Sequence, residues 1–140
     1  MEVHRKKLKL SNKISELETI RQFLAELGVA WNIAPPVILT LNLVIEEAFT
    51  NVVGYAFDDK LEHTIEIVFD KQDNILSISM IDDGKAFDPT QNAEPDINLP
   101  VAERSVGGLG VYLIKSMMDQ VEYKYKANKN ILIMRKKLES

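Results

Sequence analysis

The sequence predicts an α+β fold of two layers, in which a mixed, mostly antiparallel sheet is covered by helices on one face. Short segments at both ends and in the middle of the chain alternate apolar and polar residues, as strands do. Two longer segments repeat apolar residues every three or four positions, as helices do. With 140 residues, 46% of them hydrophobic, the chain suits one domain over residues 1–140 with a real core.

The first part of the chain predicts a strand and then two helices. Residues 3–10 end in alternating lysines and leucines, which indicates a half-buried strand. From Ile14 the apolar residues recur at three- and four-residue steps, and Gly28 is expected to end this helix. Segment 35–57 opens with two prolines, which a first helical turn tolerates, and its length favours a helix over a strand.

The second part predicts a hairpin, a long loop, a helix and a second hairpin. Residues 65–82 alternate on both sides of the turn sequence DKQDN. Residues 82–110 carry prolines, glycines and asparagines without a period, and such long loops are often lids or binding segments. A helical pattern resumes over 111–118, and 121–126 and 130–137 read as two strands.

Composition excludes several classes of function. The net charge of −4, with a pI near 5.2, removes the attraction to phosphate backbones that a nucleic-acid binder needs. There is no cysteine, hence no disulfide and no thiolate metal site. No apolar stretch follows the basic N-terminus, and the run VILTLNLVI reads as too short and too polar for a bilayer. We expect a cytoplasmic protein with no membrane segment.

Polar residues interrupt the apolar segment 35–57 at one place. Glu47 and Asn51 stand four residues apart and share a helix face, whereas Glu46 is rotated about 100° away. An unpaired carboxylate in a core is costly, so the pair lies either on a solvated stripe or at a wet site.

Two further places have residues suited to ligand binding. A strand is expected to end in Asp82, and Asp83 and Gly84 follow it. This sequence is either a simple turn, or a carboxylate at a strand end next to a glycine that lets a ligand approach the backbone closely. Three glycines, Gly107, Gly108 and Gly110, precede a helix and offer either a hinge or a phosphate seat at its N-terminus. The glycines match neither a Walker A loop nor a dinucleotide fingerprint.

Taken in this order, the three places resemble the GHKL ATPase superfamily with its Bergerat ATP-binding fold. The resemblance is strongest to the anti-sigma factor serine/threonine-protein kinases and covers the chain from about Lys9 onward. EEAFTN resembles the N box of that superfamily, DDGKAFDP its first glycine box, and GGLGVYLIKSMMDQVEY its second.

The resemblance implies a role for each matching residue. Glu47 would be the general base, Asn51 a ligand of Mg²⁺, and Asp82 the acceptor of a hydrogen bond from the adenine amino group, with Gly84 making room for the ring. The backbone of Gly108, Leu109 and Gly110 would approach the phosphates. The loop from Lys85 to Gly107 would be the ATP lid, with Arg104 and Ser105 as its phosphate contacts.

Two positions depart from the family pattern. Ala86 stands where the first glycine box commonly has its last glycine, and Tyr55 stands where relatives often have histidine. Neither change removes a catalytic group, but both bear on the fit of the lid and on nucleotide affinity.

The function that the resemblance implies is an ATP-binding anti-sigma regulatory factor with serine kinase activity. It would use Mg²⁺ and ATP, release ADP, phosphorylate an antagonist protein of the STAS type and bind a sigma factor as a homodimer. The alternative is an ATP-dependent protein-binding module without kinase activity. A sensor-kinase fragment is disfavoured, because no transducer domain is expected and the two histidines, His4 and His63, read as surface residues.

Overall fold

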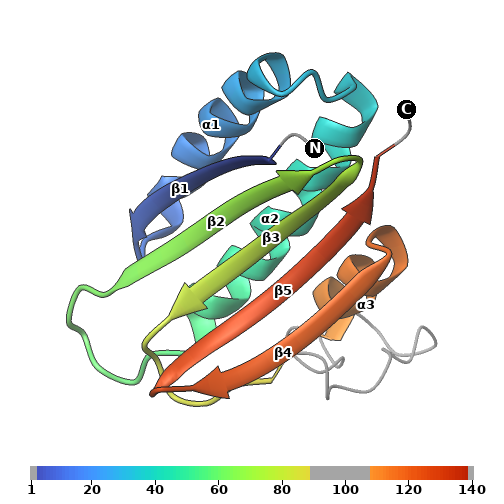
Figure 1. Cartoon of the computed structure of the whole chain (residues 1–140). Helices are drawn as coiled ribbons and strands as arrows, with labels where there is room; N and C mark the ends of the chain where they lie inside the picture. The colour runs from blue at the N-terminus through green and yellow to red at the C-terminus, as the bar shows by residue number, and fades with distance from the viewer. Residues whose placement is uncertain (1–2, 89–107, 139–140) are drawn as a thin grey trace.

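The computed structural model of the chain describes residues 3–88 and 108–138. They form one five-stranded sheet with the strand order β1-β2-β3-β5-β4, and the helices lie behind it in Figure 1. The strands are β1 (Val3–Ser11), β2 (Thr64–Gln72), β3 (Ile75–Asp82), β4 (Gln120–Lys126) and β5 (Lys129–Lys137). The helical elements are η1 (Ile14–Glu16), α1 (Leu17–Ala30), α2 (Pro35–Tyr55) and α3 (Gly108–Met117).

The predicted α+β class and element order are confirmed. All four strand pairings between described residues are antiparallel, so the parallel pair that a mixed sheet would allow does not occur among them. Because the connections are hairpins or pass through helices on one side, a single face of the sheet is covered.

The prediction that Gly28 ends the first helix is wrong, because α1 continues to Ala30. Two residues beyond the helix stands Asn32, whose φ of 54° is left-handed, and the next amide, of Ile33, donates to the carbonyl of Gly28 at 2.9 Å. This is a Schellman ending with asparagine in the place usually taken by glycine. A Cβ on Gly28 would lie 2.9 Å from Cγ1 of Ile38, so the glycine serves the close approach of α1 and α2.

Helix α2 is the central helix of the fold. Its 21 residues begin at the two prolines, as predicted, and it ends at Tyr55 rather than at Phe57. Among the described residues it is the one helix long and apolar enough to cross a membrane by length and composition, a test that the core helix of a soluble protein also passes, so the expectation of no membrane segment stays a prediction. Its buried residues are Leu41, Val44, Ile45, Ala48, Phe49, Asn51 and Val52, and all of them except Asn51 belong to the hydrophobic core.

The core lies between the helices and the covered face of the sheet. Phe23 of α1 contacts Phe69 of β2, with ring centroids 5.1 Å apart. The largest side chains in this layer are almost fully buried: Phe49, Phe69, Ile20, Leu24, Leu27, Leu41, Ile45, Ile65, Ile67, Leu76, Ile78 and Met80. At roughly 1.5–3 kcal/mol for each, this burial is the main source of stability.

Strands β4 and β5 form a hairpin with a two-residue turn. Its turn residues, Ala127 and Asn128, both have positive φ values, of 53° and 62°, as a two-residue hairpin of the primed type requires. The separate pairing of β5 with β3 places Asn130 of β5 directly opposite Asp82 of β3. Two polar residues far apart in sequence therefore meet at one end of the sheet.

Helix α3 points its N-terminus toward the same end of the sheet. It ends at Met117, just before Gln120, and Gln120 pairs with Arg135 toward the far end of β5. Because α3 runs back along β4 for ten residues, its first turn lies at the end that holds Asn130. The C-terminal part of α2 reaches this end as well (Figure 1).

Candidate functional site

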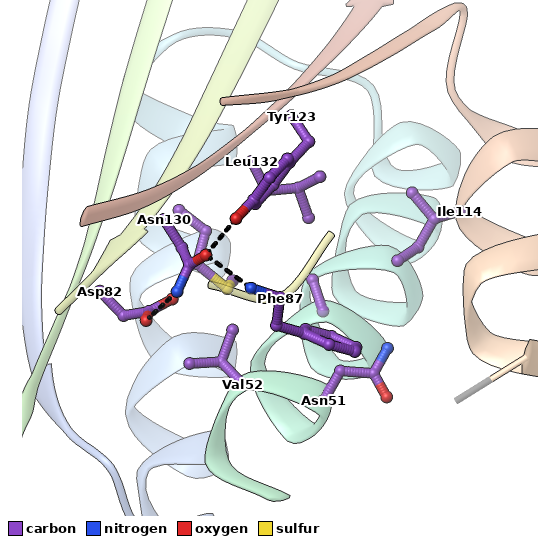
Figure 2. A pocket seen from close by; sticks show the side chains of 10 residues that line it. Asn51, Val52, Asp82, Phe87, Ile114, Tyr123, Asn130 and Leu132 are labelled. Atoms are coloured by element: carbon purple, nitrogen blue, oxygen red, sulfur yellow. Dashed lines mark hydrogen bonds between the residues drawn. The ribbon is translucent and has the colours of Figure 1, made fainter. Parts of the chain in front are cut away.

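A pocket of about 360 Å³, open solvent included, lies where α2, α3 and the ends of β3 and β5 meet. Figure 2 shows it from close by. Its lining is largely apolar with a few polar groups, a composition common in binding sites for small molecules. The lining residues are Ala48, Asn51, Val52, Met80, Asp82, Phe87, Ile114, Tyr123, Asn130 and Leu132.

Asp82 is a buried carboxylate at the end of β3, with 3% of its surface exposed. Its Oδ1 accepts hydrogen bonds from the amide of Gly84 and from Nδ2 of Asn130, both at 2.9 Å. Burial raises the pKa of the Asp82 carboxyl, and these two hydrogen bonds oppose the rise. Its second oxygen, Oδ2, makes no hydrogen bond with another described residue, so one acceptor remains for a ligand.

Asn51 lies across the pocket, on the part of α2 that faces the sheet. It is 7% exposed, and its Nδ2 is buried without a hydrogen-bond partner in the described structure. Burying an amide group without a hydrogen-bond partner destabilises the fold by about 1–3 kcal/mol. Such groups are typical of sites that bind a ligand or an ordered water. The alternative of a solvated stripe therefore does not apply to Asn51.

The two glutamates before Asn51 face different ways. Glu46 accepts a hydrogen bond from Nε of Arg21 at 2.6 Å and so faces α1. Glu47, one helical turn before Asn51, is half-buried and forms no hydrogen bond or ion pair with another described residue. Glu47 lies outside the lining of the pocket, so the structure brings Asn51 and Asp82 together but leaves Glu47 at its margin.

Gly84 joins the end of β3 to the end of α2. A Cβ at this position would lie 2.3 Å from the carbonyl oxygen of Ala56, a distance that no side chain tolerates. The amide of Lys85 donates to the same carbonyl at 2.8 Å, and Nζ of Lys85 pairs with Asp58 at 2.8 Å. The glycine is therefore needed for a backbone contact that fixes Asp82 relative to α2.

Sequence reasoning missed two residues of this site, Asn130 and Tyr123. Asn130 is 5% exposed, and the Tyr123 hydroxyl donates a short hydrogen bond to its Oδ1. In the sequence Asn130 reads as part of the turn ANKN, and only the pairing of β3 with β5 shows that it faces Asp82. Burial raises the pKa of Tyr123, which keeps the hydroxyl protonated as a donor.

The remaining predicted residues lie near the helix tip. Helix α3 begins at Gly108, so Gly108, Leu109 and Gly110 form its first turn. The predicted lid is described only as far as Asp88, where the ring of Phe87 reaches into the pocket beside Asn51 (Figure 2). Arg104, Ser105 and Gly107 lie outside the described residues.

Known proteins resemble this chain along most of its length. Residues 10–136 match the family described as the histidine kinase-like ATPase domain. The chain belongs to the histidine kinase-like ATPase family. Among the similar proteins are those named serine-protein kinase RsbW of Bacillus cereus strain AH820, Bacillus anthracis and Bacillus thuringiensis strain Al Hakam. Each is 29% identical over 130 residues, which cover 90% of this chain and 81% of the relative.

Membership of the histidine kinase-like ATPase family makes the chain a kinase-like domain that uses ATP. The open five-stranded sheet with helices on one face is the expected architecture for that family. In the described structure, the pocket is where the buried polar residues Asn51 of α2, Asp82 of β3 and Asn130 of β5 meet.

Proposed function

We propose that this protein is an ATP-dependent serine/threonine-protein kinase that acts in partner switching. Its substrate would be a serine of a small antagonist protein of the STAS type, and its second partner a sigma factor. The single observation that supports this most is the shared pocket of Asn51 and Asp82, two buried polar residues from the first two matched motifs. The name of the relatives, serine-protein kinase, supports the choice of reaction.

Asp82 would select the base of the nucleotide. The adenine amino group donates hydrogen bonds, and a buried carboxylate with one oxygen left over is a suitable acceptor. Guanine presents a carbonyl oxygen in the corresponding position, which a carboxylate repels. The apolar lining of Met80, Val52 and Ile114 would hold the ring.

Asn51 would supply an oxygen ligand to Mg²⁺. The ion prefers oxygen ligands and commonly takes only one or two from a protein, with phosphates and water completing its shell. Asn51 carries such an oxygen, Oδ1, in the wall of the pocket, whereas the atom without a partner is its Nδ2. When bound, Mg²⁺ neutralises charge on the triphosphate and so favours transfer of the terminal phosphoryl group.

Glu47 would accept the proton of the attacking serine hydroxyl. One helical turn separates Glu47 from Asn51, so the two side chains extend from the same face of α2. The absence of an ion pair with another described residue keeps the carboxylate of Glu47 available as a base. Proton transfer of this kind accounts for about 10²- to 10⁴-fold in rate.

The first turn of α3 would bind the phosphates through backbone amides. The amides of a helix N-terminus have no partner within the helix and lie at the positive end of its dipole. Gly108, Leu109 and Gly110 are the residues that would do this, with Arg104 and Ser105 as further contacts from the lid. We also propose that the protein is cytoplasmic and acts as a homodimer.

The test compares two adjacent glutamates on α2. The protein is incubated with labelled Mg-ATP and a STAS-type antagonist, and phosphoserine is measured. Glu47→Gln should keep ATP affinity and lower the transfer rate by about 10²- to 10⁴-fold. The matched control, Glu46→Gln, removes only the ion pair with Arg21 and should leave the rate unchanged.

The outcomes separate the candidate functions. Full activity of Glu47→Gln would contradict the role of general base. ATP binding by the wild type, without phosphoserine on any antagonist tested, would favour the alternative function of an ATP-dependent protein-binding module. An absence of ATP binding would refute the proposed function as a whole.

A further inference from the structure

Asn130 uses every hydrogen-bonding position of its side chain. Its Nδ2 donates to Oδ1 of Asp82 at 2.9 Å and to the carbonyl of Lys85 at 2.8 Å. Its Oδ1 accepts the amide of Phe87 at 3.0 Å and the hydroxyl of Tyr123. An asparagine side chain has two donor hydrogens and two acceptor lone pairs, so all four are used in a residue that is 5% exposed.

The pattern of partners fixes the orientation of the amide. Phe87 and Tyr123 present donors, whereas Asp82 and Lys85 present acceptors. Turning the amide over would place hydrogens against donors and an oxygen against a carboxylate, so only one orientation is compatible with these neighbours. The dashed lines of Figure 2 show three of the four bonds meeting at this one side chain.

The partners of Asn130 belong to parts of the site with different tasks. Asp82 ends β3 and is the proposed acceptor for the base, whereas Lys85 and Phe87 belong to the segment that leaves β3 toward the predicted lid. The ring of Phe87 lines the pocket. A movement of the backbone at residues 85–87 would break a hydrogen bond to Asn130. Because the Asn130 side chain also donates to Asp82, such a movement would affect the Asp82 carboxylate as well.

We propose that Asn130 is a positioning residue of the nucleotide site, which aims the Asp82 carboxylate at the base and ties its orientation to the backbone of residues 85–87. The inference rests on the proposed function, because it explains how base recognition is linked to the start of the lid. Tyr123 supports Asn130 from β4 and keeps its amide in the single orientation described above. Neither residue needs to touch the phosphates for this role.

The titration of Asp82 separates positioning from a merely structural role. The bond from Nδ2 of Asn130 favours the ionised carboxylate, so its loss should raise the pKa of Asp82 further. The other groups that act on this carboxyl are Asp83, which raises its pKa, and His63, which lowers it, and the nearby Tyr123 hydroxyl is neutral. A variant that only weakened the sheet would leave the titration of Asp82 where it is.

The first measurement needs no nucleotide. The carboxyl resonance of Asp82 is followed by NMR against pH in the full chain, in the wild type and in Asn130→Ala. We expect the titration midpoint to move upward in Asn130→Ala and exchange of the Phe87 amide hydrogen to become faster. An Asp82 midpoint equal to that of the wild type, in a folded variant, would overturn the inference.

The second measurement is ATP affinity. Asn130→Ala should bind ATP about 10- to 100-fold more weakly near neutral pH, and the pH below which binding is lost should move upward together with the Asp82 midpoint. Weaker binding without a change of either midpoint would mean a structural role only and would also overturn the inference. If the wild type bound no ATP, the proposed function would fail, while the nucleotide-free titration would still decide whether Asn130 positions Asp82.

A pair of tyrosine variants covers the case in which Asn130→Ala does not fold. Tyr123→Phe removes one hydrogen bond to Asn130 and should raise the Asp82 midpoint by a smaller amount. Tyr125→Phe is the matched control, because Tyr125 lies two residues further along β4, is 45% exposed and makes no hydrogen bond with another described residue through its hydroxyl. Equal behaviour of the two variants would count against the proposed role.

Discussion

Replacing Asp82 by asparagine tests the proposed base recognition with almost no change of shape. In Asp82→Asn the remaining carbonyl oxygen can still accept from Gly84 and from Asn130, so both internal hydrogen bonds are kept. The change falls on the other position, where a carboxylate oxygen becomes an NH₂ group. A donor then faces the amino group of adenine, which is itself a donor.

The magnitude follows from the hydrogen bond that is lost. A bond to a charged acceptor contributes about 1.5–3 kcal/mol, so ATP affinity should fall by roughly 10- to 150-fold. The new NH₂ group can donate to the carbonyl oxygen of guanine, so the preference for ATP over GTP should fall by more than the ATP affinity alone. Calorimetric titration of both nucleotides, for the wild type and for Asp82→Asn, measures the two quantities together.

The stability of the same variant provides the control. Because the folded-state pKa of Asp82 is raised, the folded protein binds a proton more tightly than the unfolded chain, and its stability falls as pH rises through the folded pKa. Asparagine carries no charge, so Asp82→Asn should gain stability relative to the wild type over that pH range. Unchanged affinity for both nucleotides in a stable variant would refute the assignment of Asp82 to the base.

Two further predictions concern the structure around the pocket. Gly84→Ala should lower the free energy of unfolding by about 1–3 kcal/mol or more, because the new Cβ would lie 2.3 Å from the carbonyl oxygen of Ala56. A denaturant titration measures this, and a change below about 0.5 kcal/mol would contradict the close contact. The hydrogen bond to Asp59 raises the pKa of His63 and lowers the pKa of Asp59. The wild type should therefore be more stable to heat than His63→Gln below pH 6.5, where the ion pair is formed. This difference in stability should disappear as pH rises through the raised pKa of His63. It should also disappear as pH falls through the lowered pKa of Asp59. An equal difference between the two proteins at every pH would rule out the ion pair.

The elements of the fold could be predicted because local patterns determine them. Alternation marks the strands, three- and four-residue spacing marks the helices, and two prolines mark the start of α2. The exceptions are residues whose role depends on a distant contact. Gly28 looks like a helix end, but the glycine is needed because Ile38 of another helix approaches it.

The same distinction applies to the candidate site. Glu47, Asn51 and Asp82 could be proposed because each belongs to a motif whose order along the chain is itself informative. Asn130 could not be proposed from the sequence, since asparagine is common in hairpin turns of all proteins and gives no sign of a functional role there. Its role depends on the register of β3 with β5, which no local pattern specifies.

The arrangement of the site has a consequence for how its functions can be separated. The proposed base contact lies on the sheet, where Asp82 is fixed by Asn130 and by the backbone contact between Gly84 and Ala56. The proposed phosphate and proton-transfer groups lie on α2 and on the tip of α3. Because these groups stand on different elements, a change at Asp82 should alter nucleotide preference without altering the rate from the bound state, and a change at Glu47 should do the reverse. Residues 85–87 are the described segment in which the two sets of groups meet, since Phe87 is bound to Asn130 through its backbone and faces Asn51 with its ring.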